Sequence, residues 1–287
     1  MRRAIIDIGT NTVKLLVADV DNGAVTPVTS KDETTRLGEG VDATKRLLPA
    51  AIDRTVRAIA RYAAAAKEVG AIDIVALTTS AARDAGNRDD FLRAVREAAG
   101  LDVQVITGDR EAELIFRGAS SDPVWSSSRL LVMDVGGGSA EFIEGQAGHV
   151  EQRLSLPLGA VRMTEKFGEA NFSAMVEFLR MSLTPALAKY DLAGRKMIGT
   201  GGTIVTLARV ARGATDHVVL TQDDVRAQVS RLYALPLEQR RRVPGLPPER
   251  ADIIVAGGLV FVVAMETLGA YELTVSIRGL RHGALLG

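Results

Sequence analysis

A short signature of aspartate and glycine that occurs twice constrains this chain more than any other feature. The first copy is Asp7-Ile8-Gly9-Thr10-Asn11-Thr12, and the second is Asp134-Val135-Gly136-Gly137-Gly138-Ser139. Each copy lies between two apolar runs, so each predicts a strand, a tight turn and a second strand. Glycine lets backbone N–H groups approach a ligand closely, and such turns form nests that bind anions. Two such hairpins predict two related half-structures that hold one phosphate chain between them.

Length and composition restrict the class of protein. The 287 residues favour two domains, and contents of 47% hydrophobic and 24% charged residues are ordinary for a globular protein. A formal net charge of +0 does not indicate a uniform basic face, so no nucleic-acid partner is expected. The absence of cysteine excludes disulfides and zinc–thiolate sites, which fits a cytoplasmic location. The longest uncharged apolar stretch, residues 253–265, is shorter than the roughly 20 residues that span a bilayer, so no membrane partner is expected.

Strand and helix signals alternate along the first part of the chain. Strands are expected at 3–9, 13–20, 24–30, 72–77 and 103–106, and helices after Pro49, at 80–99 and at 110–117. Residues 120–128 are polar and rich in turn formers. We therefore expect one domain at 1–120 and a second at 121–287.

The pattern then restarts in the second part. Strands are expected at 129–134, 139–145, 148–156, 196–198 and 272–276, and helices at 159–189, 203–209, 221–233, 247–268 and 279–286. The last helix is expected to pack back on the first domain. The pattern predicts an α/β protein of two βββαβα-like halves.

The two hairpins contain the first candidate binding residues. Asp7 and the N–H groups of Gly9, Gly136, Gly137 and Gly138 lie at the turns, and hydroxyls of Thr10, Thr12 and Ser139 and the amide of Asn11 could donate to phosphate oxygens. The alternative is that both are ordinary hairpin turns, which are often glycine-rich. An aspartate before the turn and a hydroxyl residue after it occur in both copies, which favours ligand binding.

A third glycine-rich loop runs from Gly199 to Thr203, between a predicted strand and a predicted helix. The N-terminus of that helix could present N–H groups of Gly201, Gly202 and Thr203 to an anion. The alternative is a helix cap with close packing of strand and helix. The chain contains no Walker-type phosphate loop.

Three carboxylates are candidates for a metal site and for catalysis. Asp134 and Glu141 flank the second turn, and carboxylate oxygens suit Mg²⁺. Taken alone, Glu141 fits a solvated strand position better than a metal ligand. Glu111, just before the predicted boundary, could act as a general base toward water or could simply be a charge favoured at the start of a helix.

Arg83 is a candidate phosphate-binding residue, because a guanidinium group donates several charge-assisted hydrogen bonds. The alternative is a surface position on a helix. The three histidines, His149, His217 and His282, show no spacing typical of metal ligands, and no role is assigned to them.

Together these segments resemble the exopolyphosphatase / guanosine pentaphosphate phosphohydrolase family, within the actin–sugar kinase–Hsp70 superfamily. The matching segments keep the family's order over almost the whole chain: residues 6–12, 36–40, 79–87, 108–112, 134–141, 156–160, 199–203, 249–254 and 276–283. The resemblance implies two ribonuclease-H-like domains of the actin-like ATPase fold, with the active site in the cleft between them. It implies that Glu111 is the catalytic base and that Asp134 and Glu141 hold Mg²⁺ or Mn²⁺.

The chain departs from the family pattern at two places. The first hairpin carries Thr10 and Thr12 where the family usually has serine, which keeps both hydroxyls. Position 140 is alanine where a hydroxyl residue is common, which removes one potential ligand contact. The chain resembles the short, two-domain form of the family.

The resemblance implies Mg²⁺-dependent hydrolysis of the terminal phosphoanhydride of inorganic polyphosphate, by a cytoplasmic homodimer. Guanosine pentaphosphate is an alternative substrate, because it also presents a terminal phosphoanhydride. More distant alternatives are a polyphosphate-binding sensor and an ATP-dependent kinase of the superfamily. The Glu111-Ala112 pair at the predicted domain boundary favours hydrolysis over these.

Overall fold

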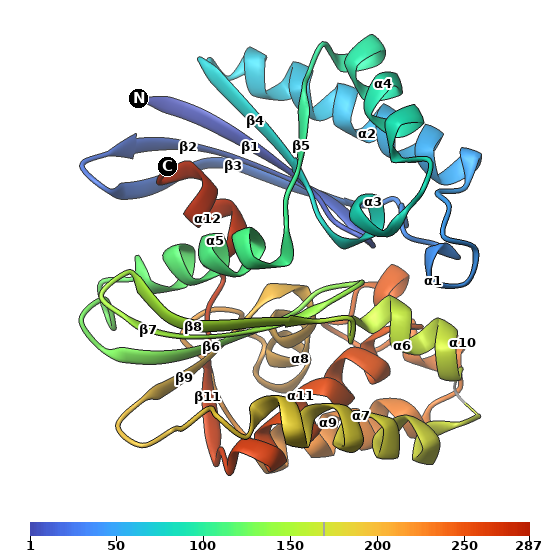
Figure 1. Cartoon of the computed structure of the whole chain (residues 1–287), viewed down its shortest axis with the longest axis vertical. Helices are drawn as coiled ribbons and strands as arrows, with labels where there is room; N and C mark the ends of the chain where they lie inside the picture. Colours follow the sequence, from blue (N-terminus) through green and yellow to red (C-terminus); the bar gives the residue numbers. More distant parts are fainter. Residues whose placement is uncertain (169) are drawn as a thin grey trace.

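The structure, a computed structural model, describes residues 1–168 and 170–287, which form two α/β halves (Figure 1). Each half is built on one mixed β-sheet, and the two sheets lie one beyond the other along the long axis of the molecule. Position 169, inside the predicted helical stretch 159–189, lies outside the described residues.

The first sheet has the strand order β3-β2-β1-β4-β5. Strand β1 pairs antiparallel with β2 and parallel with β4, so two hairpins are followed by a crossover. Its buried apolar residues, such as Ile5 and Ile6, make β1 the centre of the sheet. The strands are β1 (Arg2–Ile8), β2 (Thr12–Asp21), β3 (Ala24–Thr34), β4 (Asp73–Thr78) and β5 (Val103–Val105).

The second sheet repeats this arrangement. Its strand order is β10-β11-β9-β6-β7-β8, in which β6 pairs antiparallel with β7 and parallel with β9. The short strand β10, which the sequence pattern did not predict, adds an antiparallel edge beside β11. The strands are β6 (Arg129–Val135), β7 (Ala140–Gln146), β8 (His149–Leu156), β9 (Lys196–Thr200), β10 (Val219–Thr221) and β11 (Glu272–Val275).

Helices cover the outer face of each sheet (Figure 1). On the first half these are α2 (Pro49–Glu68) and α4 (Arg88–Ala99), whose apolar residues share a core with β1 and β2. The second half has α7 (Phe172–Leu187), α8 (Gly201–Arg212), α9 (Gln222–Ala234) and α11 (Ile254–Leu268) around its core. No helix in the described part of the chain is long and apolar enough to cross a membrane.

The remaining helices are short. Two predictions here were wrong. The helix predicted at 247–268 starts only at residue 254, because residues 251–253 form turns. The single helix predicted at 80–99 is divided into α3 (Ser80–Asp84) and α4. Ala85 adopts an extended backbone, and the N–H of Gly86 donates to the carbonyl of Lys45 instead of continuing the helix. The others are α1 (Val41–Thr44), α6 (Ala160–Phe167), α10 (Leu237–Arg240) and the 3₁₀ helix η1 (Pro248–Arg250).

Two helices lie between the sheets and join the halves. They are α5 (Gly108–Ser120), which starts at an N-cap formed by Thr107, and α12 (Leu280–Leu285) near the C-terminus (Figure 1). One apolar cluster includes Leu77 of the first sheet, Phe116 of α5, Val132 of the second sheet and Leu285 of α12. The two halves therefore share a core around α5 and α12.

Candidate active site

The two hairpins face each other across a cavity of about 380 Å³ between the halves. Every predicted site residue except Arg83 lines it: Asp7, Gly9, Thr10, Asn11, Thr12, Glu111, Asp134, Gly136, Gly137, Gly138, Ser139, Glu141, Gly201, Gly202 and Thr203. Residues that are far apart in the sequence thus meet in one place.

The first hairpin joins β1 to β2. The N–H of Gly9 donates to the carbonyl of Thr12 at 3.1 Å, which closes the turn. The carbonyl of Thr10 accepts from the N–H of Gly38 at 2.8 Å. The Thr10 carbonyl and the Asn11 N–H belong to one trans peptide, in which they point in opposite directions. The N–H of Asn11 therefore points away from Gly38, and no acceptor for it lies in the described part of the protein. This donor is available to a ligand.

The second hairpin, between β6 and β7, is closed in the same way, by the N–H of Gly136 and the carbonyl of Ser139 at 3.0 Å. The carbonyls of Gly136 and Gly137 accept from the first turn of α6 at 2.9 and 2.8 Å. The carbonyl of Gly138 accepts from Nε of Arg162 at 2.9 Å. The N–H groups of Gly137, Gly138 and Ser139 therefore point away from α6, and none has an acceptor within residues 1–168 and 170–287. Such a row of free N–H groups is an anion-binding nest.

Asp134 and Glu141 lie opposite each other on β6 and β7. Burial raises the pKa of Asp134 to about 6. Burial, together with the charge of Asp134, raises the pKa of Glu141 to about 7, although Ser155 Oγ donates to Glu141 Oε1 at 2.8 Å and opposes this shift. Two buried carboxylates that resist ionisation side by side are a favourable environment for a cation.

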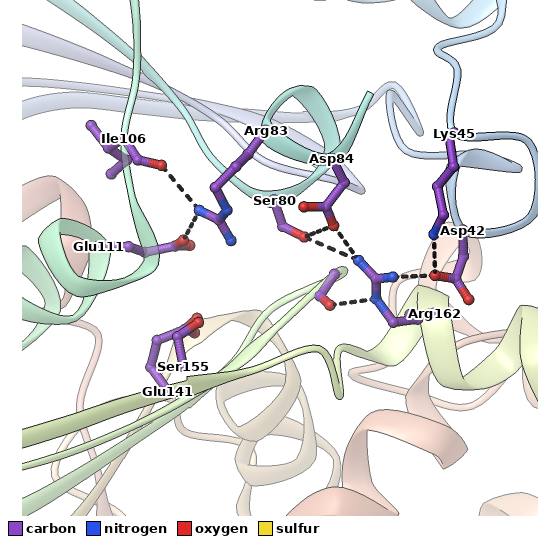
Figure 2. Close-up of polar contacts among 11 residues, drawn as sticks. Asp42, Lys45, Ser80, Arg83, Asp84, Ile106, Glu111, Glu141, Ser155 and Arg162 are labelled. Carbon is purple, nitrogen blue, oxygen red and sulfur yellow. Dashed lines mark hydrogen bonds and ion pairs between the residues drawn. The ribbon is translucent and has the colours of Figure 1, made fainter. Parts of the chain in front are cut away.

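Glu111 lies in the first turn of α5 and is only 7% exposed. Burial raises its pKa well above the usual range, and the charge of Glu141 raises it further. Arg83 opposes this shift, because its Nη1 lies 3.3 Å from Glu111 Oε2 and also donates to the carbonyl of Ile106 at 3.0 Å (Figure 2). Arg83 does not line the cavity but contacts Glu111, which does. The predicted contact of Arg83 with phosphate stays a prediction.

One register position separates the two hairpins chemically. Lys14 lies opposite Asp7 on the first hairpin, at the position that Glu141 occupies opposite Asp134 on the second. Burial raises the pKa of Asp7, and the charge of Lys14 opposes that shift. The first hairpin therefore has an acid and a base, whereas the second has two acids.

Four cations that the sequence patterns did not assign line the cavity: Lys14, Arg209, Arg250 and Arg281. Arg250 Nη2 lies 3.4 Å from Thr12 Oγ1, and Arg281 Nη1 donates to Ser30 Oγ at 3.0 Å. None of the four forms an ion pair with another residue that the structure describes. Segments 249–254 and 276–283 had pointed to Arg250 and Arg281 by resemblance, but without a role.

The third glycine-rich loop packs against these groups. Gly201 has a φ of +83°, and a Cβ there would overlap the carboxylate of Asp134. A Cβ on Gly202 would overlap the guanidinium of Arg250. Thr203 Oγ1 donates to the carbonyl of Val135 at 2.9 Å, so this hydroxyl proton is already used. The loop makes room for a carboxylate and a cation, and its predicted contact with phosphate stays a prediction.

His282 also lines the cavity, although its sequence spacing gave it no role. Its burial lowers the pKa of the imidazole to about 4, so the ring is neutral near pH 7.

Within the described residues, no group of three or more His, Cys, Asp or Glu side chains is arranged to hold a metal ion. A cation bound by Asp134 and Glu141 would need further ligands from water or substrate, which is usual for Mg²⁺.

Comparison with known proteins agrees with this arrangement. Residues 16–287 match the family model of the Ppx/GppA phosphatase family. The chain belongs to this family. Among curated Ppx/GppA relatives, exopolyphosphatase 2 of Mycobacterium tuberculosis (strain CDC 1551 / Oshkosh) is 34% identical, and the match covers 99% of this chain and 98% of that protein. Exopolyphosphatase 1 of Mycobacterium leprae (strain TN) is 33% identical, over 100% of this chain and 89% of that protein.

A solved structure of similar length has the same fold. The exopolyphosphatase from Cytophaga hutchinsonii ATCC 33406 superposes with a TM-score of 0.91 at 27% identity, over 99% of this chain and 96% of that one. The predicted Ppx/GppA family and the predicted class of two ribonuclease-H-like halves with an actin-like fold are confirmed.

Proposed function

We propose that this Ppx/GppA chain is an exopolyphosphatase that hydrolyses the terminal phosphoanhydride of inorganic polyphosphate. The observation that carries the proposal is the placement of Glu111, a buried carboxylate with a raised pKa, in one cavity with two turns that present free N–H groups. The mycobacterial relatives named as exopolyphosphatases support it.

The terminal phosphate would bind between the two hairpins. The N–H groups of Asn11, Gly137, Gly138 and Ser139 would donate to its oxygens. The rest of the chain would follow the cations of the cavity, since each added phosphate brings negative charge that Lys14, Arg250 or Arg281 can pair. Cations that form no ion pair with a described carboxylate are suited to this, because the charge of the ligand can pair with them.

Glu111 would act as the general base. It would accept a proton from a water molecule while the water oxygen forms a bond to the terminal phosphorus. The bond from that phosphorus to the bridging oxygen breaks, and the shortened polyphosphate leaves with the bonding electrons. A raised pKa makes Glu111 a stronger base than an exposed carboxylate, and Arg83 would hold it in place.

Asp134 and Glu141 would hold Mg²⁺, and Mn²⁺ could take the same oxygen ligands. These two carboxylates suit a divalent cation because they lie opposite each other and have raised pKa values, which a bound cation would lower. The ion would supply positive charge that offsets charge developing on the phosphoryl oxygens.

Guanosine pentaphosphate is the second candidate substrate. No described residue that lines the cavity is Phe, Tyr or Trp, so a guanine base could stack only on the imidazole of His282 or on an arginine guanidinium. This favours a linear polyphosphate. A polyphosphate-binding sensor would not need a buried base beside the phosphate site. The relatives named as exopolyphosphatases favour hydrolysis over an ATP-dependent kinase. A homodimer and a cytoplasmic location stay predictions.

One assay tests the proposal: phosphate release from long polyphosphate, short polyphosphate, guanosine pentaphosphate and ATP, measured side by side with Mg²⁺. We expect polyphosphate to be hydrolysed with the highest kcat/KM. A higher kcat/KM for guanosine pentaphosphate or ATP would contradict the substrate assignment, and no release from any of the four would contradict the proposed activity.

A further inference from the structure

Arg162, in the first turn of α6, touches both halves of the molecule beside the Gly136–Ser139 turn (Figure 2). Its side chain is only 13% exposed. Nε donates to the carbonyl of Gly138 in its own half at 2.9 Å. On the other half, Nη1 pairs with Asp42 of α1, and Nη2 pairs with Asp84 of α3 at 2.5 Å. Nη2 also lies 3.4 Å from Ser80 Oγ of α3. A guanidinium is a rigid planar fork, so these four partners fix both its position and its orientation.

The contact with Gly138 reaches the phosphate-binding turn directly. The carbonyl of Gly138 and the N–H of Ser139 belong to one peptide plane and point in opposite directions. Because Arg162 holds that carbonyl, it also sets the direction of the Ser139 N–H. A Cβ on Gly138 would lie 2.7 Å from Thr10 Oγ1 and would overlap Ser80 Oγ, so the first half packs closely against this peptide.

Among the described residues, other polar contacts between the halves do not touch the turn, and two of them illustrate this. Arg36 pairs with Asp252 at 2.6 Å, and the N–H of Gly40 donates to Glu165 at 3.0 Å. These contacts hold the halves together, but neither reaches the carbonyl of Gly138. Arg162 thus contacts both the first half, through Asp42 and Asp84, and the Gly138 carbonyl of the turn.

We propose that Arg162 is a positioning residue that couples closure of the two halves to the geometry of the Gly136–Ser139 turn. The inference rests on the proposed function, because it assigns regulation to the same site. When Asp42 and Asp84 lie against α6, the guanidinium is fixed and the turn presents its N–H groups to phosphate. When the halves separate, Arg162 loses both anchors and the peptide between Gly138 and Ser139 is free to rotate.

The first test measures the kinetics of phosphate release from polyphosphate. In Arg162→Met the turn loses its anchor, and we expect kcat to fall about 10- to 100-fold, as for other small errors in the position of reacting groups. Arg162→Lys should not rescue kcat, because one ammonium cannot hold the carbonyl and both carboxylates. The double variant Asp42→Asn/Asp84→Asn keeps Arg162 and should show a similar fall in kcat.

The matched control is Arg61→Met, which removes an exposed ion pair to Glu33 within the first half. We expect this variant to keep the kcat of the wild-type protein. A wild-type kcat in Arg162→Met would overturn the positioning role. A wild-type kcat in the double aspartate variant, beside a reduced one in Arg162→Met, would overturn the coupling to closure.

The second test measures the distance between the two halves and does not depend on enzyme activity. It therefore separates this inference from the proposed function. The chain has no cysteine, so Ala50→Cys on α2 and Ala174→Cys on α7, both exposed, give one spin label in each half. We expect the label distance to be broader and longer in Arg162→Met than in the protein with native Arg162. Identical distance distributions would overturn the coupling, whatever substrate the wild-type protein hydrolyses.

Discussion

At the scale of single residues, one register position accounts for the different chemistry of the two hairpins. Lys14 and Glu141 lie at corresponding places, opposite Asp7 and Asp134. With lysine there, the first hairpin resembles a cradle for anions. With glutamate there, the second hairpin has two carboxylates whose pKa values are raised by burial. The metal role of Asp134 and Glu141 can be tested through this property.

The folded pKa values, about 6 for Asp134 and about 7 for Glu141, lie above the ordinary values of about 3.9 and 4.3. The folded protein therefore binds more protons than the unfolded chain in this range. The stability linked to these protons is complete below about pH 4 and is lost as the pH rises through about 7. Mg²⁺ binds the ionised carboxylates, so it should raise the melting temperature more at about pH 8 than at about pH 5.

Melting temperatures with EDTA and with Mg²⁺, at both pH values, check this expectation. The variant Asp134→Asn/Glu141→Gln serves as the control, because the difference from wild type removes the contributions of other titrating groups. We expect the Mg²⁺ effect to disappear in the control. A Mg²⁺ effect of equal size in wild type and control would place the metal elsewhere.

At the scale of elements, α5 and α12 depend on glycine to approach each other. A Cβ on Gly118 would overlap the carbonyl of Gly279, and a Cβ on Gly283 would overlap the carbonyl of Leu114. Because the clash is with backbone atoms, it cannot be relieved by a change of rotamer. This close approach holds α5, and with it Glu111, against the second sheet.

Gly118→Ala should therefore destabilise the protein by about 1–3 kcal/mol, the usual cost of overpacking. Urea unfolding measures this change in the free energy of unfolding. In the control variant, Gly86→Ala, the added Cβ would lie 3.7 Å from the nearest neighbour, the carbonyl of Lys45, which is ordinary contact. Equal stability of the two variants would show that α5 and α12 tolerate a wider separation.

Features of the elements that depend on local sequence could be predicted, and features that depend on distant contacts could not. The hairpins at Gly9 and Gly136 follow from glycine between apolar runs. The break between α3 and α4 follows from a hydrogen bond between Gly86 and Lys45, which no helical periodicity reports. Strand β10 exists because β11 offers it an edge.

The residues of the site divide in the same way, into those that the sequence predicts and those that only the packing brings together. The residue types alone left Glu111 and Glu141 with ordinary alternatives, and the resemblance to the family supplied the predicted roles of Glu111, Asp134 and Glu141. Lys14, Arg250 and Arg281 are ordinary in sequence, and only the packing of the two halves brings them to one cavity. Arg162 is similar, because its partners come from three separate segments of the chain.

At the scale of the whole molecule, the cavity exists because two halves face each other. The chain crosses between them after α5 and again before α12, and the apolar cluster around these helices keeps the crossings packed. The paired halves could be predicted from the doubled signature, but their relative placement could not, since it depends on contacts such as that between Arg36 and Asp252.

The central claim is that Glu111 is the base for hydrolysis in this cavity, and one measurement tests it most directly. Phosphate release and polyphosphate binding are compared in wild type, in Glu111→Gln and in the control Glu113→Gln, whose carboxylate pairs with Arg110 on the surface of the same helix. We predict that Glu111→Gln binds polyphosphate but loses at least about 100-fold in kcat, the usual contribution of a general base, while Glu113→Gln keeps its turnover. Wild-type turnover in Glu111→Gln would contradict the account.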